Sequence, residues 1–388
     1  KTMDLMSTYE FVKYNIEKNP LVGNATSPTP TYYFLTRPGL TLDDYKNISG
    51  EDWQSPFFQT GRMQDYSLSI RGGKGGAKQT LYSISGNLND HSGTIINTGY
   101  KRYQGRITID QTLSKKLKVG LNTSYTFMQR SGLSAAQGTG GSGTTNILYS
   151  VWGSSPLTPI SDEGGEAIDD MINSTTDYRY NPLLNQQNSE RESKTTNLSL
   201  NTYLEYSILP SLKLRITGIV NQATVVDEAF NNSKSYLGNP ITAPGRLNGV
   251  NGSTYTGKVA NWANENTLTW SKVYNKRHNF NVLAGFTAQG NKSSRNGFGS
   301  TLLPNEKIGL SGLEEGVISA SSIVATSSLW NLASFLGRAK YNFDGKYYVE
   351  ASYRADGSSK FASKNHWGYF PSVATSWRFS KEDFLKEN

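Results

Sequence analysis

The sequence predicts an all-β protein: a partial transmembrane, antiparallel up-and-down β-barrel with about 11 strands. Apolar and polar residues alternate with a period of two in eleven segments, which is typical of strands. Short and long connections between those segments follow each other in turn, as in membrane barrels. Of the 388 residues, 36% are hydrophobic and 12% aromatic. No apolar run reaches the roughly 18 residues of a transmembrane helix, whereas alternating barrel strands keep mean hydropathy low.

The alternation is clearest near the start, where Tyr66, Leu68 and Ile70 are separated by Ser67 and Ser69. Because successive side chains of a strand point to opposite faces, this pattern predicts one apolar and one polar face. The eleven predicted strands are centred on residues 66–70, 82–88, 103–109, 117–127, 198–208, 212–220, 260–270, 280–286, 335–343, 347–353 and 373–379.

The connections divide into two length classes. The short ones are residues 72–78, 114–115, 210–211, 273–278 and 344–345, where Asp344-Gly345 is a strong hairpin signal. The long ones are residues 89–99, 130–193, 227–257, 292–329 and 355–367. Membrane barrels have short periplasmic turns and long extracellular loops, so the alternation favours a barrel over a soluble sandwich.

Aromatic residues cluster near the short turns, which suits a periplasmic-side girdle, although cross-strand pairing would explain them equally well. They are Tyr206, Trp270, Phe343, Tyr347, Trp377 and Phe379.

An odd strand count predicts an incomplete barrel, because bacterial single-chain barrels have even counts and lipid does not tolerate open edges. No signal peptide opens the sequence, and a fragment of a longer chain explains both features. We therefore expect residues 1–62 to be an extracellular loop, residues 63–379 to hold the barrel strands and loops, and residues 380–388 to be a periplasmic turn.

Other functions find little support in the residues. The net charge is +8, but no basic run or patch points to nucleic acid. There is no Cys, and three isolated histidines form neither a metal-ligand pair nor a catalytic triad, so we expect no enzyme. The glycine-rich residues 138–143 lack the P-loop ending. We expect no cofactor, except for a weak Ca²⁺ candidate in the longest loop. Its acidic residues are Asp162, Glu163, Asp169 and Asp170.

Several segments resemble the SusC/RagA-like family of TonB-dependent transporters. They include Asp52-Trp53-Gln54, residues 65–73 and 103–125, and Tyr180-Asn181-Pro182-Leu183. The most specific block runs from residue 337 to 384, and we expect its signature residues to be structural. These are Arg338, Arg354, Asp356, Gly357, Ser358, Ser359, Phe361, Trp367, Gly368, Phe370, Pro371, Trp377 and Arg378.

The resemblance covers nearly the whole chain and implies several properties. Such transporters have a plug inside a 22-stranded barrel in the outer membrane of Gram-negative bacteria. A SusD-like surface lipoprotein covers the mouth, and TonB-ExbB-ExbD supplies energy through an N-terminal region that this sequence does not contain. By resemblance the chain carries strands two to twelve and would not transport alone.

The same resemblance implies a substrate and an assembly. The expected substrate is an oligosaccharide, or a peptide in transporters of the RagA type, and a dimer of transporter–lid pairs is expected. A passive porin-type channel and a soluble β-rich binding protein remain as alternatives.

Loop aromatics are the candidates for substrate contact, because flat rings suit sugar faces and peptide side chains. Loop packing or contact with the lid protein is the alternative for each. The candidates are Tyr149, Trp152, Tyr178, Tyr180 and Trp330.

Overall fold

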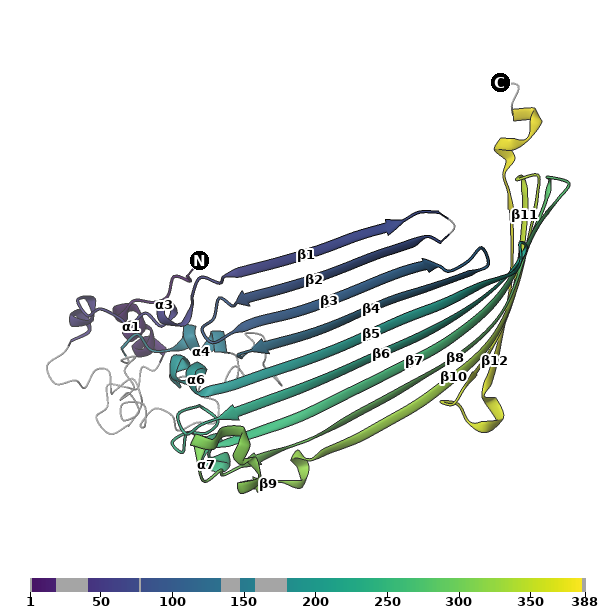
Figure 1. Ribbon diagram of the computed structural model, residues 1–388. Coiled ribbons are helices and arrows are strands. Elements are labelled where there is room, and N and C mark those ends of the chain that lie inside the picture. The colour runs from purple at the N-terminus through teal and green to yellow at the C-terminus, as the bar shows by residue number, and fades with distance from the viewer. Residues whose placement is uncertain (1, 19–40, 77, 134–146, 158–179, 386–388) are drawn as a thin grey trace.

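The computed structural model describes residues 2–18, 41–76, 78–133, 147–157 and 180–385. This part of the chain forms a single antiparallel sheet in which eleven long strands lie in chain order, and the short β9 pairs with β8 beside them. Figure 1 shows an open, curved sheet with β1 at one edge and β12 at the other. The predicted all-β, up-and-down architecture and its strand number are confirmed, and the sheet does not close on itself.

All neighbouring strands pair antiparallel, as consecutive hairpins must. The strands are β1 (Met63–Lys74), β2 (Thr80–Ser92), β3 (Gly99–Thr112), β4 (Leu117–Ser131), β5 (Ser189–Leu209), β6 (Leu212–Asn231), β7 (Asn251–Tyr274), β8 (His278–Thr301), β9 (Val317–Ile318), β10 (Val324–Phe343), β11 (Tyr347–Ser358) and β12 (Trp367–Trp377).

Short helices occupy the connections and the two ends of the described chain. They are α1 (Thr8–Lys18), η2 (Leu42–Lys46), α3 (Gln54–Phe57), α4 (Ile147–Gly153), α6 (Pro182–Asn188), α7 (Ala243–Asn248), η4 (Glu306–Glu315), η5 (Ala320–Ser322), η6 (Ser363–Asn365), η7 (Phe379–Lys381) and η8 (Asp383–Leu385). Residues 1–62, which are predicted to be an extracellular loop, contain α1, η2 and α3. No helix within the described ranges is long and apolar enough to cross a membrane.

Tight turns and long connections lie on opposite rims of the sheet, as predicted (Figure 1). The turn between β10 and β11 shows the local cause. Asp344 and Gly345 have φ values of 56° and 66°, the left-handed pair of a type I′ turn, and the Lys346 N–H donates to the Phe343 carbonyl at 2.9 Å. Asn275 and Lys276 adopt the same region, at 48° and 56°, between β7 and β8. We call these two borders the tight-turn rim and the long-loop rim.

The strands run further toward the long-loop rim than predicted. The expected loop 227–257 shortens to 232–250, and the expected loop 292–329 shortens because β8 ends at Thr301 and β10 begins at Val324. β7 and β8 each have 24 residues, whereas a tilted strand needs about 9–11 to span a membrane. The apolar alternation ends where lipid contact would end, while the hydrogen-bond ladder continues past that point.

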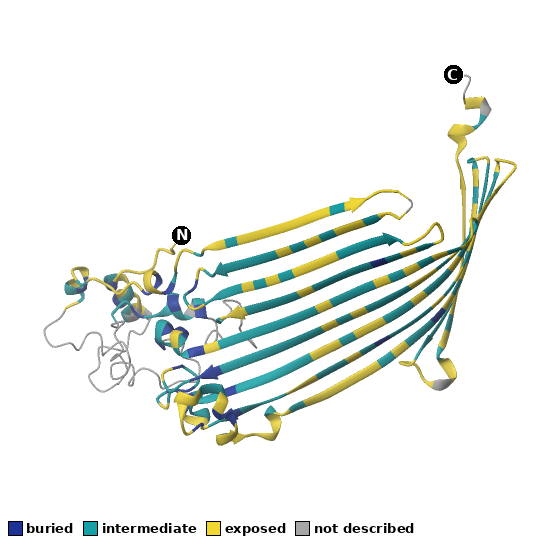
Figure 2. Ribbon diagram, in the orientation of Figure 1, coloured by how far each residue is buried: buried dark blue, intermediate teal, exposed yellow. Residues whose placement is uncertain are grey.

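Buried apolar side chains gather at the long-loop rim rather than within the sheet (Figure 2). One cluster joins Trp53, Phe57, Ile95, Ile147 and Val151, so that α3 and α4 pack over the β2–β3 connection. The Trp53 indole Nε1 also donates to the Ser155 carbonyl at 2.9 Å. This rim therefore has its own packed core, while the sheet leaves both faces to be covered by something else.

Candidate functional site

The two faces of the sheet differ sharply in chemistry. Register partners that face one side form a row crossing the sheet from β1 to β7, which we call the apolar row: Ile70, Ile84, Ile107, Thr123, Leu200, Val220 and Trp262. Since side chains alternate along a strand, the residues one position away face the other side. We name these faces the apolar face and the polar face.

The polar face carries a matching row of hydroxyl, amide and guanidinium groups that ends at an indole, here called the polar row. Its members, in successive register from β2 to β10, are Ser85, Arg106, Ser124, Ser199, Asn221, Asn261, Asn291 and Trp330. Ser199 Oγ donates to Asn221 Oδ1 at 2.7 Å, and Asn291 Nδ2 donates to Asn261 Oδ1 at 2.5 Å. The row presents amide and hydroxyl groups with remaining donor and acceptor capacity to whatever fills that side.

A second polar group, the β1–β3 patch, lies on the same face nearer the long-loop rim. Asp65 accepts a hydrogen bond from Asn89 and lies 3.0 Å from His91 Nε2. Arg102 Nη2 donates to Asn87 Oδ1 at 3.2 Å. One charged guanidinium, one carboxylate, an imidazole and two amides thus lie side by side on one wall.

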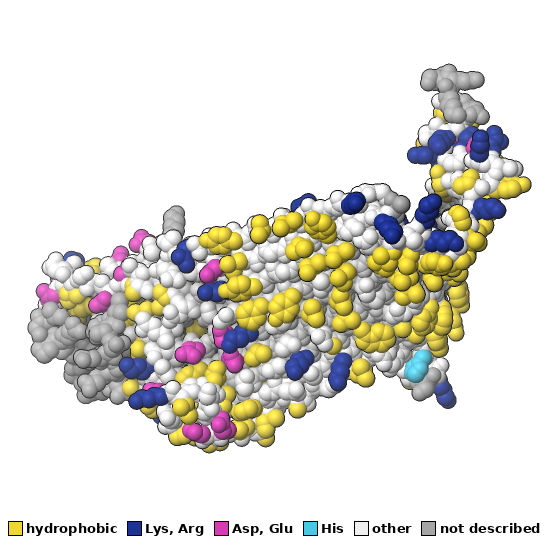
Figure 3. Space-filling model, viewed as in Figure 1, with side chains coloured by type: hydrophobic (Ala, Val, Ile, Leu, Met, Phe, Trp, Pro, Cys, Tyr) yellow, Lys and Arg dark blue, Asp and Glu magenta, His cyan; other side chains and the backbone are white. Residues whose placement is uncertain are grey.

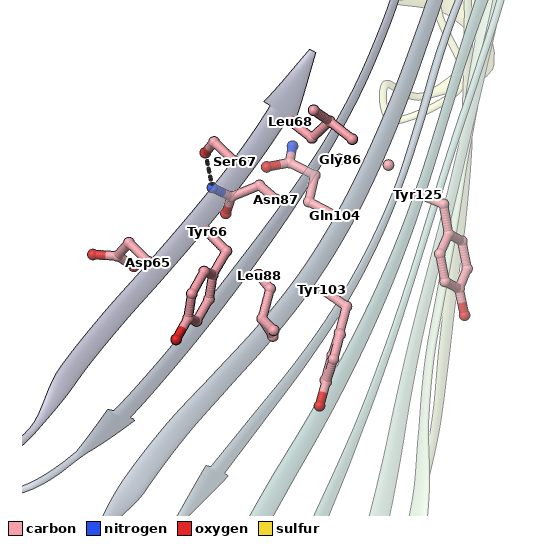
Figure 4. A pocket seen from close by; sticks show the side chains of 11 residues that line it. Asp65, Tyr66, Ser67, Leu68, Gly86, Asn87, Leu88, Tyr103, Gln104 and Tyr125 are labelled. Atoms are coloured by element: carbon pink, nitrogen blue, oxygen red, sulfur yellow. Dashed lines mark hydrogen bonds between the residues drawn. The ribbon is translucent and has the colours of Figure 1, made fainter.

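On the apolar face, over β1 to β4, lies a shallow hollow of about 670 Å³ (Figure 4). Gly86 and Gly105 pair across β2 and β3, and a Cβ at either would meet no atom within 4 Å. In Figure 4 the side chains of Tyr66, Tyr103 and Tyr125 point the same way, and Asn87 Nδ2 donates to Ser67 Oγ at 2.6 Å. The hollow exists because two adjacent positions of the sheet carry no side chain.

Apolar side chains cover the part of the apolar face nearer the tight-turn rim. On β4 they run from Leu117 to Phe127, eleven positions, which matches a strand crossing the apolar band of an outer membrane at a tilt. Polar groups inside this band satisfy one another: Asn266 Nδ2 donates to Asn264 Oδ1 at 2.5 Å, and Asn264 Nδ2 to the Thr217 carbonyl at 3.3 Å. Figure 3 shows the hydrophobic area with charged side chains along its borders.

The border toward the long-loop rim is a row of charge. Asp90 and Lys101 are register partners 3.6 Å apart. Further along, Lys194 Nζ lies 2.5 Å from Glu192 and 3.1 Å from Glu228. Charged groups are costly within hydrocarbon and inexpensive at its edge, so this row marks one limit of the apolar band.

The aromatics predicted near the short turns do gather at the tight-turn rim. Phe343 and Tyr347 have ring centroids 6.3 Å apart, and Tyr347 and Trp377 stack at 6.5 Å with an interplanar angle of 8°. Trp377 in turn contacts Phe379 edge-on at 6.3 Å. These ring contacts show cross-strand packing, and the girdle at the periplasmic side stays a prediction.

The side chain of Glu382 stabilises this rim through hydrogen bonds. Its carboxylate accepts hydrogen bonds from Tyr347 Oη at 2.6 Å, Trp377 Nε1 at 3.0 Å and Lys346 Nζ at 3.0 Å. These bonds, led by that of Tyr347, lower the pKa of Glu382 to about 2. The carboxylate therefore ties the segment after β12 to the β10–β11 hairpin.

The five candidate aromatics do not form one site. Tyr180 is 7% exposed, and its hydroxyl donates to the Lys234 carbonyl at 2.5 Å, so loop packing accounts for it. Burial raises the pKa of Tyr180 to about 12. Trp152 is half-buried on α4 against the Trp53 cluster. Tyr178 and the side chain of Tyr149 lie outside the described residues.

Trp330 was expected in a loop, and that expectation is wrong: it lies in β10, at the end of the polar row. The reason is the unpredicted extension of β10 beyond the apolar alternation. Lys360 Nζ lies 4.9 Å from the Trp330 ring centroid, so a residue of the β11–β12 connection covers the indole. Trp330 is the candidate that faces the same side as the amides.

The signature residues hold β10, β11 and β12 together. Arg354 Nε donates to Asp356 Oδ1 at 2.6 Å, and the Trp367 indole lies over Gly357, where a Cβ would meet it at 2.9 Å. Ser359 exchanges two hydrogen bonds with the backbone of Asn331, its N–H donating at 3.0 Å and its Oγ accepting at 2.9 Å.

The remaining signature residues take part in the same strands or their ends. Arg338 lies 4.0 Å from Glu350, and the Arg378 N–H donates to the Lys346 carbonyl at 2.7 Å. Gly368 lies under the Phe370 ring, and Pro371 pairs with Tyr353. The Ser358 N–H donates to the His366 carbonyl at 2.9 Å, and Phe361 is 62% exposed in the β11–β12 connection.

Within the described residues, no group of three or more His, Asp or Glu could hold a metal ion. The acidic residues Asp162, Glu163, Asp169 and Asp170, like the glycine-rich residues 138–143, lie outside the described part of the chain.

The polar row and the β1–β3 patch were not predicted from the sequence. The polar row takes one residue from each of eight strands, and the patch takes its members from β1, β2 and β3, so only strand register brings them together. The one signal was the polar half of each alternating strand, which showed that a polar face exists without showing which residues are neighbours.

An antiparallel up-and-down sheet with an apolar band on one face and a polar opposite face defines the class: part of the wall of an outer-membrane β-barrel. No known protein-family profile matches the chain. Among curated proteins, it is 28% identical to TonB-dependent receptor P3 of Formosa agariphila, over 87% of this chain and 32% of that protein. It is 24% identical to the TonB-dependent receptor SusC of Bacteroides thetaiotaomicron, over 87% of this chain and 33% of that protein.

Among solved structures, the RagAB peptide transporter superposes with a TM-score of 0.72 at 19% identity, covering 99% of this chain and 43% of that one. The RagAB peptide importer in its open-open state gives 0.71 at 19% identity, with 99% and 42% covered. These comparisons confirm the resemblance to SusC/RagA-like TonB-dependent transporters of the Gram-negative outer membrane. The chain spans about a third of the length of the curated relatives it matches.

Proposed function

We propose that this chain is the wall of a SusC-like importer that carries oligosaccharides across the outer membrane and is energised by TonB-ExbB-ExbD. The observation that carries the proposal is the pair of adjacent rows on opposite faces. The apolar row suits lipid, and the polar row suits a hydrated lumen. The Ser and Asn side chains of the polar row suit sugar hydroxyls, because each can both donate and accept hydrogen bonds.

We orient the sheet with its tight-turn rim toward the periplasm and its long-loop rim toward the exterior. Residues 1–62 then belong to the extracellular side, residues 63–379 to the barrel wall, and residues 380–388 to a periplasmic turn. A SusD-like lipoprotein would cover the long-loop rim, and a plug would occupy the polar face. Two such pairs would form a dimer. No residue of the chain is assigned a catalytic role in this proposal.

A peptide substrate is the second candidate, and the likeness to the RagAB peptide transporter favours it. Amide groups such as those of Asn221 and Asn261 suit peptide backbones as well as sugars. Binding of oligosaccharides and of short peptides to the intact transporter, measured by calorimetry, separates the two candidates.

The test of import is uptake by cells that carry the intact transporter. Uptake should stop when TonB is deleted, whereas a passive channel would continue to pass its solute. Asn221→Leu, on the polar face, should weaken substrate binding about twofold to tenfold, because one hydrogen bond contributes about 0.5–1.5 kcal/mol. Gln222→Leu is the matched control, since it changes the next residue of β6 on the apolar face. Equal effects of both would argue against a substrate path along the polar row.

A further inference from the structure

The border of the apolar band toward the long-loop rim carries four lysines on the apolar face. Lys101 on β3 and Lys194 on β5 lie in one register row. The other two, Lys258 on β7 and Lys292 on β8, continue this border across the next strands of the sheet. A lysine at such a border can keep its stem in hydrocarbon and its ammonium among headgroups.

Two of the four are neutralised within the sheet. Lys101 has Asp90 at 3.6 Å, and Lys194 has Glu192 at 2.5 Å and Glu228 at 3.1 Å. These ammonium groups need no outside partner.

Lys258 and Lys292 differ. Both side chains are exposed, and no carboxylate oxygen of the described residues lies within 4.0 Å of either ammonium. Lys258 pairs with Ser294, and Lys292 pairs with Ala260, so the two lysines are diagonal neighbours on adjacent strands. Such neighbours are about 7–8 Å apart at their Cα atoms. Two like charges therefore adjoin with only polar and apolar neighbours, an arrangement that an anion between them would stabilise.

Apolar surface continues from this pair into the band. Trp262 follows Ala260 as the next residue of β7 on the apolar face. It is 47% exposed, and its indole lies over Gly290. Leu329, the partner of Lys292 on β10, is 67% exposed. A ligand with an anionic head and a hydrocarbon tail would find complementary surface for both parts.

We propose that Lys258 and Lys292 bind the phosphate of an anionic membrane lipid, whose acyl chain lies against Trp262 and Leu329. In the orientation proposed above this lipid belongs to the outer leaflet. The choice of leaflet rests on the proposed function, whereas the binding of the lipid by the two lysines does not. The charge complementarity favours an anionic lipid over a protein partner, because the lysines stand directly at the edge of the hydrocarbon surface.

The experiment uses the intact, delipidated transporter and native mass spectrometry with phosphatidylglycerol as the anionic probe and phosphatidylcholine as the zwitterionic one. The double variant K258Q/K292Q should bind phosphatidylglycerol roughly tenfold to thirtyfold more weakly, since each lysine near an anionic surface adds about one kcal/mol. Its binding of phosphatidylcholine should not change. K258R/K292R should retain binding, because the charges remain.

The matched control is K101Q/K194Q, which removes two lysines that already have carboxylate partners and should weaken binding less than about threefold. Equal losses in the two double variants, or no loss in K258Q/K292Q, would overturn the proposal. Inorganic phosphate at millimolar concentration should not displace the lipid, and displacement would indicate a simple anion site instead. Uptake by the same variants is a separate measurement, so failure of import would leave the lipid result standing.

Discussion

The tight-turn half and the long-loop half of β6 share one uninterrupted hydrogen-bond ladder, yet their side chains obey different rules. On the apolar face, Leu214 and Ile216 occupy the first half, and Thr224 and Glu228 occupy the second. The backbone pairs in register throughout the strand from Leu212 to Asn231. The change is therefore one of solvent: the first half meets hydrocarbon, and the second projects into water. The apolar alternation in this protein therefore marks the part of a strand that faces the membrane, and it does not mark the full length of the strand.

The largest expected effect comes from placing a charge in each half of β6. Ile216→Arg on the apolar face should lower the free energy of unfolding by about 2–4 kcal/mol, as arginine does near the middle of a bilayer. Thr224→Arg, on the same face and strand, should cost about 0–1 kcal/mol. Denaturant unfolding of the intact barrel in lipid vesicles measures both. Similar costs at the two positions would contradict the assigned border.

A smaller effect is expected from packing where β11 ends and β12 begins, beside the long-loop rim. Gly357→Ala would bring a Cβ to 2.9 Å from the Trp367 indole, so overpacking should cost about 1–3 kcal/mol. Gly337→Ala on β10 is the control, because its Cβ would meet no atom within 4 Å. Thermal unfolding of both variants separates them. If Gly357→Ala were as stable as Gly337→Ala, the close approach of Trp367 to β11 would be wrong.

The smallest effect concerns the tight-turn rim and its pH dependence. The pKa of Glu382 is lowered from 4.5 to about 2, so its carboxylate contributes stability that is present above about pH 4.5 and is lost as the pH falls toward 2. Trp377 donates to this carboxylate, so its fluorescence should change as the pH falls through about 2, where the carboxylate is protonated in the folded protein.

In Glu382→Gln the change in fluorescence centred near pH 2 should disappear, because position 382 no longer carries a carboxylate. A transition in the variant equal to that of the parent protein would show that another group is responsible.

Most of the strand architecture could be predicted because its signals are local. The alternation of Tyr66, Leu68 and Ile70 identified β1, and Asp344-Gly345 identified the β10–β11 turn. The strand ends at the long-loop rim could not be predicted, because polar residues such as those of β7 near Asn251 carry no alternation. Trp330 was predicted to lie in a loop for the same reason, because the first part of β10 carries no apolar alternation.

The candidate site was less accessible to sequence reasoning. A polar face was expected, but Asn221, Asn261 and Asn291 become neighbours only through the register of β6, β7 and β8. The pairing of Lys194 with two glutamates, and the lack of such partners for Lys258 in the described chain, depends on the same register. A shift of one residue would move each side chain to the opposite face.

The amino-acid sequence by itself determined the strand period, the tight turns and the presence of one apolar and one polar face, because each depends on residues close together in the chain. Only the tertiary structure decided how far the strands project, which side chains form rows, and which charges have no partner among the described residues. Those properties depend on contacts between residues tens of positions apart, and the strand register that creates these contacts is set jointly by the turns and by the apolar face of the whole sheet.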